Sequence, residues 1–150
     1  MLTFEHVTFN KGVQMKYISN SVEQTIDIAM QFAETLKGGE TVLLSGDLGA
    51  GKTHFAKGVA RQFGIDEVVT SPTFTLHNCY QGRLTLNHFD FYRIDDPEEV
   101  AILGLDELFS VPDGVALIEW SQNVKSLLPS KCIVVTVSKT GENSREIDIQ

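Results

Sequence analysis

The chain has 150 residues, of which 42% are hydrophobic and 21% charged, and its 20 acidic and 12 basic side chains give a net charge of −8 at pH 7. This composition is typical of one soluble globular domain with a buried core, and no apolar stretch approaches the roughly 20 residues of a membrane span. The negative charge disfavours direct nucleic-acid binding, and without a signal-peptide pattern at the N-terminus we expect a cytoplasmic protein.

The first predicted element is a helix that begins after Ser21. Ser21 and Gln24 have the spacing of a capping box, and Gly38-Gly39 ends the helical pattern. One helix face is formed by apolar residues at helical spacing, namely Ile26, Ala29, Met30, Ala33 and Leu36. Residues 1–15 have no clear pattern, and Met15 could be a second start site that makes residues 1–14 an N-terminal extension.

A glycine-rich loop between a strand and a helix is the most informative feature of the sequence. The apolar segment Thr41–Ser45 predicts a buried strand, and the spacing of apolar residues predicts a helix over Thr53–Phe63, with Gly64 as its C-terminal cap. Between them, residues 46–53 match the pattern G-x-x-x-x-G-K-[ST] without departure. In that pattern the loop N–H groups surround the phosphates of a nucleotide, the lysine reaches the terminal phosphates and the hydroxyl binds Mg²⁺. The alternative is a glycine-rich turn with an incidental lysine.

The second half of the chain predicts mainly strands. Phe74–Tyr80 and Arg83–Phe91 indicate a hairpin around a turn at Gln81-Gly82. A proline and four acidic residues open a helix over residues 95–99, and the apolar run 115–118 predicts a central strand. Residues 132–138 and 145–149 indicate a closing strand pair. We therefore predict an α/β fold, a single P-loop NTPase domain with a central, mostly parallel sheet, a β-hairpin, antiparallel edge strands and helices on both faces.

Two carboxylates and a hydroxyl-rich loop are candidates for nucleotide chemistry, which needs groups that hold Mg²⁺ and position the attacking oxygen. Asp90 ends the second hairpin strand, and Glu119 directly follows the strand 115–118. Because ligands bind outside the carboxyl ends of strands in open α/β sheets, we expect both to face the phosphate loop, although acidic residues at strand ends are also common without a function. A hydroxyl of the loop Thr70–Thr73 could contact the γ-phosphate, or the loop could be an ordinary turn.

Some aromatic and sulfur-containing side chains have both a functional and a structural interpretation. Trp120 could stack near the nucleotide or a partner, but a lone tryptophan more often packs in the core. His77 and His88 fit core or surface positions, and no other residue completes a metal site with them. Cys79 and Cys132 have no metal-ligand spacing and are expected to be buried, reduced thiols.

Four motifs, in this order and spacing, resemble the TsaE (YjeE) family over residues of about 20 to 150. They are the phosphate loop 46–53, Thr70-Ser71-Pro72-Thr73-Phe74-Thr75-Leu76, His88-Phe89-Asp90-Phe91-Tyr92-Arg93 and Glu119-Trp120. The phosphate loop is common to many NTPases, whereas the three later motifs are more specific to this family.

The resemblance implies a bacterial cytoplasmic ATPase, using ATP and Mg²⁺, that is needed to form threonylcarbamoyladenosine at position 37 of tRNAs that read codons starting with A. It implies that the protein acts on tRNA only through the partner proteins TsaD and TsaB, and that its ATPase activity is weak without them. It further implies Lys52, Asp90 and Glu119 as catalytic residues and Thr53, Asp90 and Glu119 as metal ligands. The implied nucleotide contacts are Val22, Gly46, Asp47, Leu48, Gly49, Ala50, Gly51, Lys52, Thr53, His54, Thr70, Thr73, Trp120 and Arg145.

Two other functions stay open from the sequence. A small-molecule kinase can also be a single phosphate-loop domain of this size, but such an enzyme usually needs several arginines to clamp an acceptor and a closing lid. This chain offers only Arg61, Arg83, Arg93 and Arg145. A non-catalytic nucleotide switch would require nucleotide binding alone.

Overall fold

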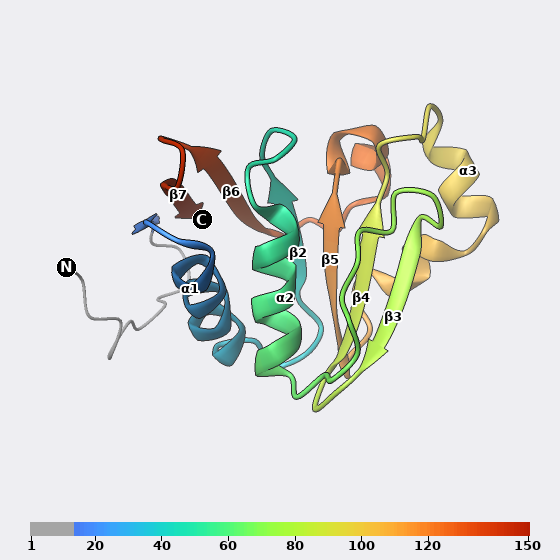
Figure 1. Cartoon of the computed structure of the whole chain (residues 1–150). Coiled ribbons are helices and arrows are strands. Elements are labelled where there is room, and N and C mark those ends of the chain that lie inside the picture. Colours follow the sequence, from blue (N-terminus) through green and yellow to red (C-terminus); the bar gives the residue numbers. More distant parts are fainter. Residues whose placement is uncertain (1–13) are drawn as a thin grey trace.

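The computed structural model describes residues 14–150, which are organised on one seven-stranded sheet with the order β1-β7-β6-β2-β5-β4-β3 (Figure 1). The strands are β1 Met15–Ser19, β2 Thr41–Ser45, β3 His77–Gln81, β4 Thr85–Asp90, β5 Gly114–Glu119, β6 Ile133–Lys139 and β7 Arg145–Ile149. The α-helices are α1 Val22–Glu34, α2 Lys52–Gln62 and α3 Pro97–Ile102, and the 3-10 helices are η2 Leu105–Leu108 and η3 Ser121–Leu127.

The four central strands β6, β2, β5 and β4 run parallel to one another. β3 is antiparallel to β4 at one edge, and β7 and β1 continue antiparallel from β6 at the other. The description "mostly parallel" therefore fits the centre of the sheet and not the whole of it. Parallel pairing places the carboxyl ends of β2, β4 and β5 at the same edge, where Glu119 lies opposite Leu44 on one side and Asp90 on the other.

Helices cover the two faces of the sheet unequally. α1 and α2 lie side by side on one face (Figure 1), where the rings of Phe32 and Phe55 pack with centroids 5.8 Å apart. The other face is covered by shorter segments, α3, η2 and η3, around Phe89, Phe109 and Val124. Both sides of β5 are buried, as the apolar run predicts, because its alternate residues enter the two different cores.

Most element starts agree with the sequence signals, whereas helix α1 ends early. The Ser21 side chain caps α1 by accepting from the Gln24 amide, and the Gln24 side chain accepts from the amide of Asn20. The last residue of α1 is Glu34, four residues before Gly38. The predicted strand 41–45 and the starts of α2 and α3 are confirmed to within one or two residues.

The hairpin differs from its prediction at both ends. Leu76 has a left-handed φ of +67°, so residues 74–76 leave the strand conformation and β3 begins at His77. Gln81 pairs with Thr85, which makes residues 82–84 the turn instead of Gln81-Gly82. The amide of Arg83 donates to the Phe63 carbonyl at 2.8 Å, which ties this turn to the end of α2.

Three further expectations concern the edges of the sheet and the chain start. Cys79 lies on the edge strand β3 and is exposed, not buried, and Cys132 is half-buried. Met15 belongs to β1, where it pairs with Ile149, and residues 1–13 of the possible extension 1–14 lie outside the described residues. Among the helices within residues 14–150, none combines the length and the apolar character needed to cross a membrane.

The contact between α1 and α2 generates a prediction for Gly58. A Cβ atom at this position would lie 2.5 Å from both the Cβ of Ala29 and the carbonyl oxygen of Ile26. We expect Gly58→Val to lower the free energy of unfolding by about 1–3 kcal/mol, because the two helices must separate. Urea unfolding measures this effect. Arg61→Ala, at an exposed position of the same helix, should change stability by less than about 0.5 kcal/mol, and equal stability of the two variants would contradict the close contact.

Candidate functional site

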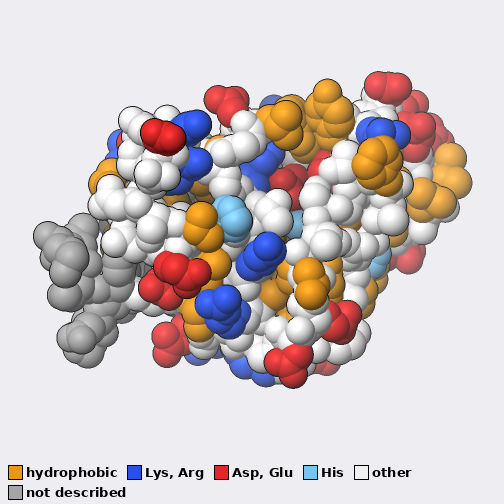
Figure 2. Space-filling view, viewed as in Figure 1, with side chains coloured by type: hydrophobic (Ala, Val, Ile, Leu, Met, Phe, Trp, Pro, Cys, Tyr) orange, Lys and Arg blue, Asp and Glu red, His pale blue; other side chains and the backbone are white. Residues whose placement is uncertain are grey.

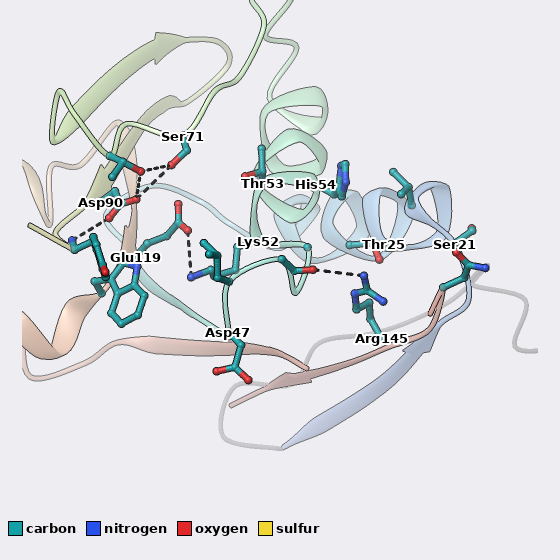
Figure 3. Close-up of a pocket in the computed structure, with 18 of the residues that line it drawn as sticks. Ser21, Thr25, Asp47, Lys52, Thr53, His54, Ser71, Asp90, Glu119 and Arg145 are labelled. Carbon is teal, nitrogen blue, oxygen red and sulfur yellow. Dashed lines mark hydrogen bonds and ion pairs between the residues drawn. The ribbon is translucent and has the colours of Figure 1, made fainter. Parts of the chain in front are cut away.

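A cavity of about 1000 Å³ lies at the sheet edge where β2, β4 and β5 end (Figure 3). Its walls come from the start of α1, the loop after β2, the loop 71–73, the ends of β4 and β5, and the turn between β6 and β7. Figure 2 shows the molecular surface hollowed in this region, with acidic and basic atoms inside the hollow and apolar atoms at its rim. The cavity is as large as the upper range of small-molecule sites in proteins.

Within the loop 46–53, residues 46–51 connect β2 to α2, and this connection needs glycine at both of its ends. Gly46 has a φ of +151°, and a Cβ atom there would collide with the carbonyl oxygen of Val137 on β6. Gly51 has a φ of +109° and is the N-cap of α2. Because no side chain caps this helix, its first N–H groups can donate hydrogen bonds to an anion. The helix dipole also favours negative charge at this point.

Arg145, at the start of β7, holds the loop from the opposite side. Its Nε donates to the Ala50 carbonyl at 2.7 Å, and Nη2 donates to the Gly49 carbonyl at 3.5 Å. Its Nη1 donates to Ser144 of its own turn at 2.9 Å. In a planar trans peptide the carbonyl and the following N–H point in opposite directions, so the bond to Ala50 also fixes the direction of the Gly51 amide.

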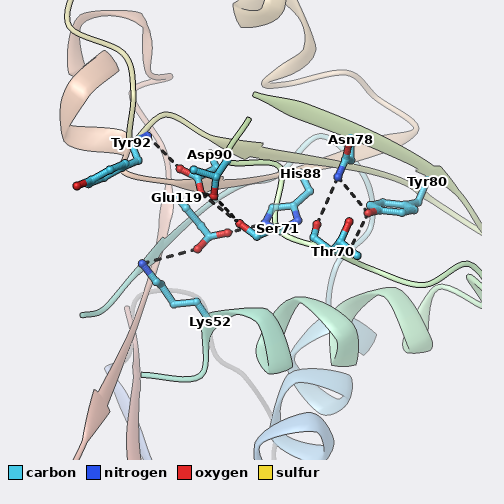
Figure 4. A network of polar contacts seen from close by, with 10 residues as sticks. Lys52, Thr70, Ser71, Asn78, Tyr80, His88, Asp90, Tyr92 and Glu119 are labelled. Atoms are coloured by element: carbon cyan, nitrogen blue, oxygen red, sulfur yellow. Dashed lines mark hydrogen bonds and ion pairs between the residues drawn. The ribbon is translucent and has the colours of Figure 1, made fainter. Parts of the chain in front are cut away.

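Lys52, Glu119 and His88 form a buried chain of polar contacts (Figure 4). The Lys52 ammonium lies 3.7 Å from Oε1 of Glu119, and Nε2 of His88 lies 2.7 Å from Oε2. Only 9% of Lys52, 4% of Glu119 and none of His88 is exposed. The ammonium also lies 5.0 Å from the ring centroid of Trp120, whose φ of +58° is unusual for a residue other than glycine.

Asp90 is tied to the hydroxyl loop. Its Oδ2 accepts from Thr73 at 2.8 Å and from Ser71 at 3.3 Å, and its Oδ1 accepts from the Tyr92 amide at 2.9 Å. The Asp90 amide donates to the Leu76 carbonyl at 3.0 Å. The loop 71–76 is therefore fastened to the end of β4 at two points, on the side of the cavity opposite Arg145 (Figure 3).

The structure brings most of the predicted site residues to the cavity and leaves three out. Those that line it are Val22, Asp47, Leu48, Gly49, Gly51, Lys52, Thr53, His54, Thr73, Asp90, Glu119, Trp120 and Arg145. Gly46 lies against β6, and the Ala50 side chain points from the loop into the core. Thr70 is exposed outside the cavity, and its amide donates to the Tyr80 hydroxyl at 3.3 Å. The lining residues absent from the predicted site are Asn20, Ser21, Thr25, Ser71, Tyr92, Glu142 and Asn143.

The sequence held a signal for some of these residues. Ser71 and Tyr92 belong to the motifs that carry the Thr70–Thr73 loop and Asp90. His88 precedes Asp90 by two residues in a strand, so period-two alternation places both on one side of β4. The residues from α1 and from the β6–β7 turn had no such signal, because only the sheet order brings these segments to the loop.

The described side chains of the site cannot complete the coordination shell of a divalent cation by themselves, so a bound ligand or water would have to supply the remaining oxygens. Within residues 14–150 there is no group of three or more His, Cys, Asp or Glu side chains that could hold a metal ion. Asp47 and Glu142 also line the cavity, and the side chains there that the sequence predicts as metal ligands are the Thr53 hydroxyl and the carboxylates of Glu119 and Asp90. This set fits Mg²⁺, which typically takes one or two carboxylates and completes its shell with phosphate oxygens and water.

Comparisons with known proteins point to one family. The family model "Threonylcarbamoyl adenosine biosynthesis protein TsaE" matches residues 19–147. The chain is 42% identical over 135 residues to a Bacillus subtilis protein named tRNA threonylcarbamoyladenosine biosynthesis protein TsaE, covering 89% of this chain and 84% of the relative. It is 39% identical to the protein of the same name from Treponema pallidum, covering 90% and 99%. The crystal structure of Bacillus subtilis YdiB superposes with a TM-score of 0.79 at 38% identity, covering 91% of this chain and 84% of that one.

The bonds of Arg145 generate a prediction for the loop. Arg145→Met keeps an unbranched side chain that reaches about as far as Nε but removes every donor, so the peptide planes at Gly49 and Ala50 lose their fixed direction. We expect amide hydrogen exchange in residues 49–53 to accelerate by about tenfold, the equivalent of roughly 1.4 kcal/mol and the size of one or two hydrogen bonds. Lys139→Met removes a cation at an exposed position of β6 and serves as the control. Unchanged exchange in Arg145→Met would mean that the loop holds its shape unaided.

Proposed function

Since the chain belongs to the TsaE family, we propose that it binds and hydrolyses ATP with Mg²⁺ in this cavity, as the ATPase of threonylcarbamoyladenosine biosynthesis at position 37 of tRNA. In this proposal it acts through the partner proteins TsaD and TsaB, and its activity is weak without them. One observation carries the proposal, namely that the loop 46–53 presents Lys52 to Glu119 at 3.7 Å, at the floor of a cavity wide enough for a nucleotide.

The phosphate chain would bind at the N-terminus of α2. The uncapped amides of this helix and the Lys52 ammonium supply donors and positive charge. Lys52 now neutralises Glu119, so incoming phosphates would replace one anionic partner of this lysine by another. A purine base would lie toward Val22 and Arg145, which line the same cavity. Arg145 lies on the side of the cavity opposite Asp90 (Figure 3).

The hydrolytic step would depend on Thr53 and the two carboxylates. The Thr53 hydroxyl and Glu119 would hold Mg²⁺, which when bound neutralises charge on the phosphate oxygens. Glu119 would also polarise the attacking water by accepting its hydrogen bond. Asp90 would act beside it by holding the loop 71–73, whose hydroxyls lie near enough to the cavity to meet the terminal phosphate.

The charges of the chain favour this proposal over a small-molecule kinase. A kinase needs cations that clamp an acceptor, but Arg145 is the only arginine that lines the cavity within the described part of the chain, and its guanidinium is engaged by loop carbonyls. Arg83 donates to the C-terminal carbonyls of α1 and lies outside the cavity. The net charge of −8 also disfavours direct contact with tRNA, which fits an action through partner proteins.

The central test is ATP hydrolysis by the purified protein, alone and with TsaD and TsaB. We expect slow turnover alone and at least tenfold stimulation by the two partners, and we expect Lys52→Ala to abolish both by removing the charge that holds the phosphates. Lys57→Ala, on the same helix but outside the cavity, is the matched control. Turnover that ignores the partners but rises with a small acceptor would instead support a kinase, and undiminished turnover of Lys52→Ala would contradict the assignment of the loop.

Glu119 separates an ATPase from a non-catalytic switch. Glu119→Gln keeps the size of the side chain and an oxygen that can accept from His88. We expect it to bind ATP, measured with a fluorescent analogue, while hydrolysis slows more than tenfold, a loss of at least about 1.4 kcal/mol of transition-state stabilisation. A variant that supports tRNA modification as well as the wild type, despite slow hydrolysis, would favour the switch. An unchanged rate would remove Glu119 from the mechanism.

A further inference from the structure

We propose that His88 is a positioning residue that acts through Glu119, holding this carboxylate in one orientation by a hydrogen bond from Nε2–H. The inference deepens the proposed function and rests on it, because the purpose of the fixed orientation is ATP hydrolysis. His88 itself does not line the cavity, so it would touch neither nucleotide nor metal.

The geometry gives each oxygen of Glu119 a separate partner. Oε2 lies 2.7 Å from Nε2 of His88, which is fully buried on β4, and Oε1 lies 3.7 Å from the Lys52 ammonium in the phosphate loop. Asp90 pairs with Glu119 in the parallel register of β4 and β5, and this brings His88, two residues earlier, within reach. One oxygen is thus bound by the buried His88, while the other is paired with Lys52, which lines the cavity (Figure 4).

The second ring nitrogen decides which tautomer is present. Nδ1 of His88 is buried and has no hydrogen-bond partner among the described residues. A hydrogen on Nδ1 alone would be a buried donor without an acceptor, which costs more than a bare lone pair in the same place. The ring therefore carries its hydrogen on Nε2 and donates it to Glu119.

The same nitrogen excludes a role as a proton relay. A relay would pass a proton in at Nε2 and out at Nδ1 to a second acceptor, and Nδ1 has no hydrogen-bond partner within residues 14–150. The ring is also closed to solvent, with none of its surface exposed. The contacts of His88 therefore fit a role in orienting the Glu119 carboxylate.

This orientation becomes most important once the nucleotide is bound. Lys52 then turns to the phosphates, and Glu119 loses the ion pair that holds Oε1. The bond to His88 remains, and a glutamate pinned at one oxygen keeps far fewer of its rotamers than a free one. Oε1 would thus stay directed at the metal and the attacking water while the lysine serves the phosphates.

The test compares two substitutions of nearly equal size. His88→Gln can place an amide N–H close to the position of Nε2, whereas His88→Leu fills the space without a donor. We expect His88→Leu to lower kcat for ATP hydrolysis at least tenfold with the nucleotide Kd changed less than about twofold, and His88→Gln to recover kcat to within about threefold of the wild type. A residue needed only for packing would not distinguish the two variants in this way.

A second measurement needs neither a variant nor activity. Long-range ¹H–¹⁵N NMR of the imidazole in the wild-type protein reports which nitrogen carries the hydrogen. We expect it on Nε2, 2.7 Å from Oε2 of Glu119. A hydrogen on Nδ1 would overturn the proposal, and so would His88→Leu turning over at the wild-type rate or His88→Gln failing to recover.

The two proposals fail differently. If the wild-type protein does not hydrolyse ATP even with TsaD and TsaB, the proposed function fails, whereas the NMR spectrum still decides the tautomer. If the wild type hydrolyses ATP and His88→Leu does so equally well, only the positioning role is lost. If His88→Leu does not fold, the NMR result and the rate of His88→Gln decide alone.

Discussion

The parallel pairing of β5 with both β2 and β4 is the constraint on which the site depends. In parallel strands all carboxyl ends meet at one edge, so the loop that follows β2 and the carboxylates that end β4 and β5 come together without a segment built for the purpose. The register is fixed from within, because β5 buries alternate residues in two different cores. A slip by one residue would exchange these cores and move Glu119 away from both His88 and Lys52.

The charged side chains at this edge are costly to bury, and they concentrate in one place. Lys52, His88, Asp90 and Glu119 are all less than 10% exposed. A buried ion pair rarely repays the desolvation of its members, so the contact between Lys52 and Glu119 is poorly explained by stability. In the proposed ATPase this contact would be a resting state, in which Lys52 and Glu119 hold each other until a phosphate chain binds the lysine. The bond from His88 to Glu119 lowers the cost for the carboxylate and not for the lysine, which leaves the lysine as the group free to change partners.

What the sequence could predict was local, and what it missed was brought about by distant contacts. The strand 41–45, the phosphate loop and the cap at Ser21 each depend on residues a few positions apart, and all three are present. The hairpin turn was placed one residue early because Arg83 is held by the Phe63 carbonyl, twenty residues away in sequence. The cavity wall around Ser21 and Asn143 has no local sequence signal for the same reason, since β1 and β7 reach the loop only through the sheet order, and only the resemblance named the neighbouring Val22 and Arg145. Arg145 was predicted as a nucleotide contact by resemblance alone, and its hydrogen bond to the Ala50 carbonyl has no sequence signature.

The surroundings of Asp90 and Glu119 assign the two carboxylates different work. Both oxygens of Asp90 are engaged, one by the hydroxyls of Ser71 and Thr73 and the other by the Tyr92 amide. Oε1 of Glu119 is paired with Lys52 at 3.7 Å, and both residues line the cavity. In the proposed ATPase, Glu119 is therefore the carboxylate with an oxygen available to a metal or a water. Asp90 holds the hydroxyl loop in position through Ser71 and Thr73. A terminal phosphate that drew Thr73 away would leave Oδ2 of Asp90 with only the longer contact to Ser71, so the same ligand that occupies Lys52 would also loosen the loop. Binding and release of that phosphate would then change the contacts of both carboxylates. The change would also alter the conformation of loop 71–76, which a partner protein could contact at the surface.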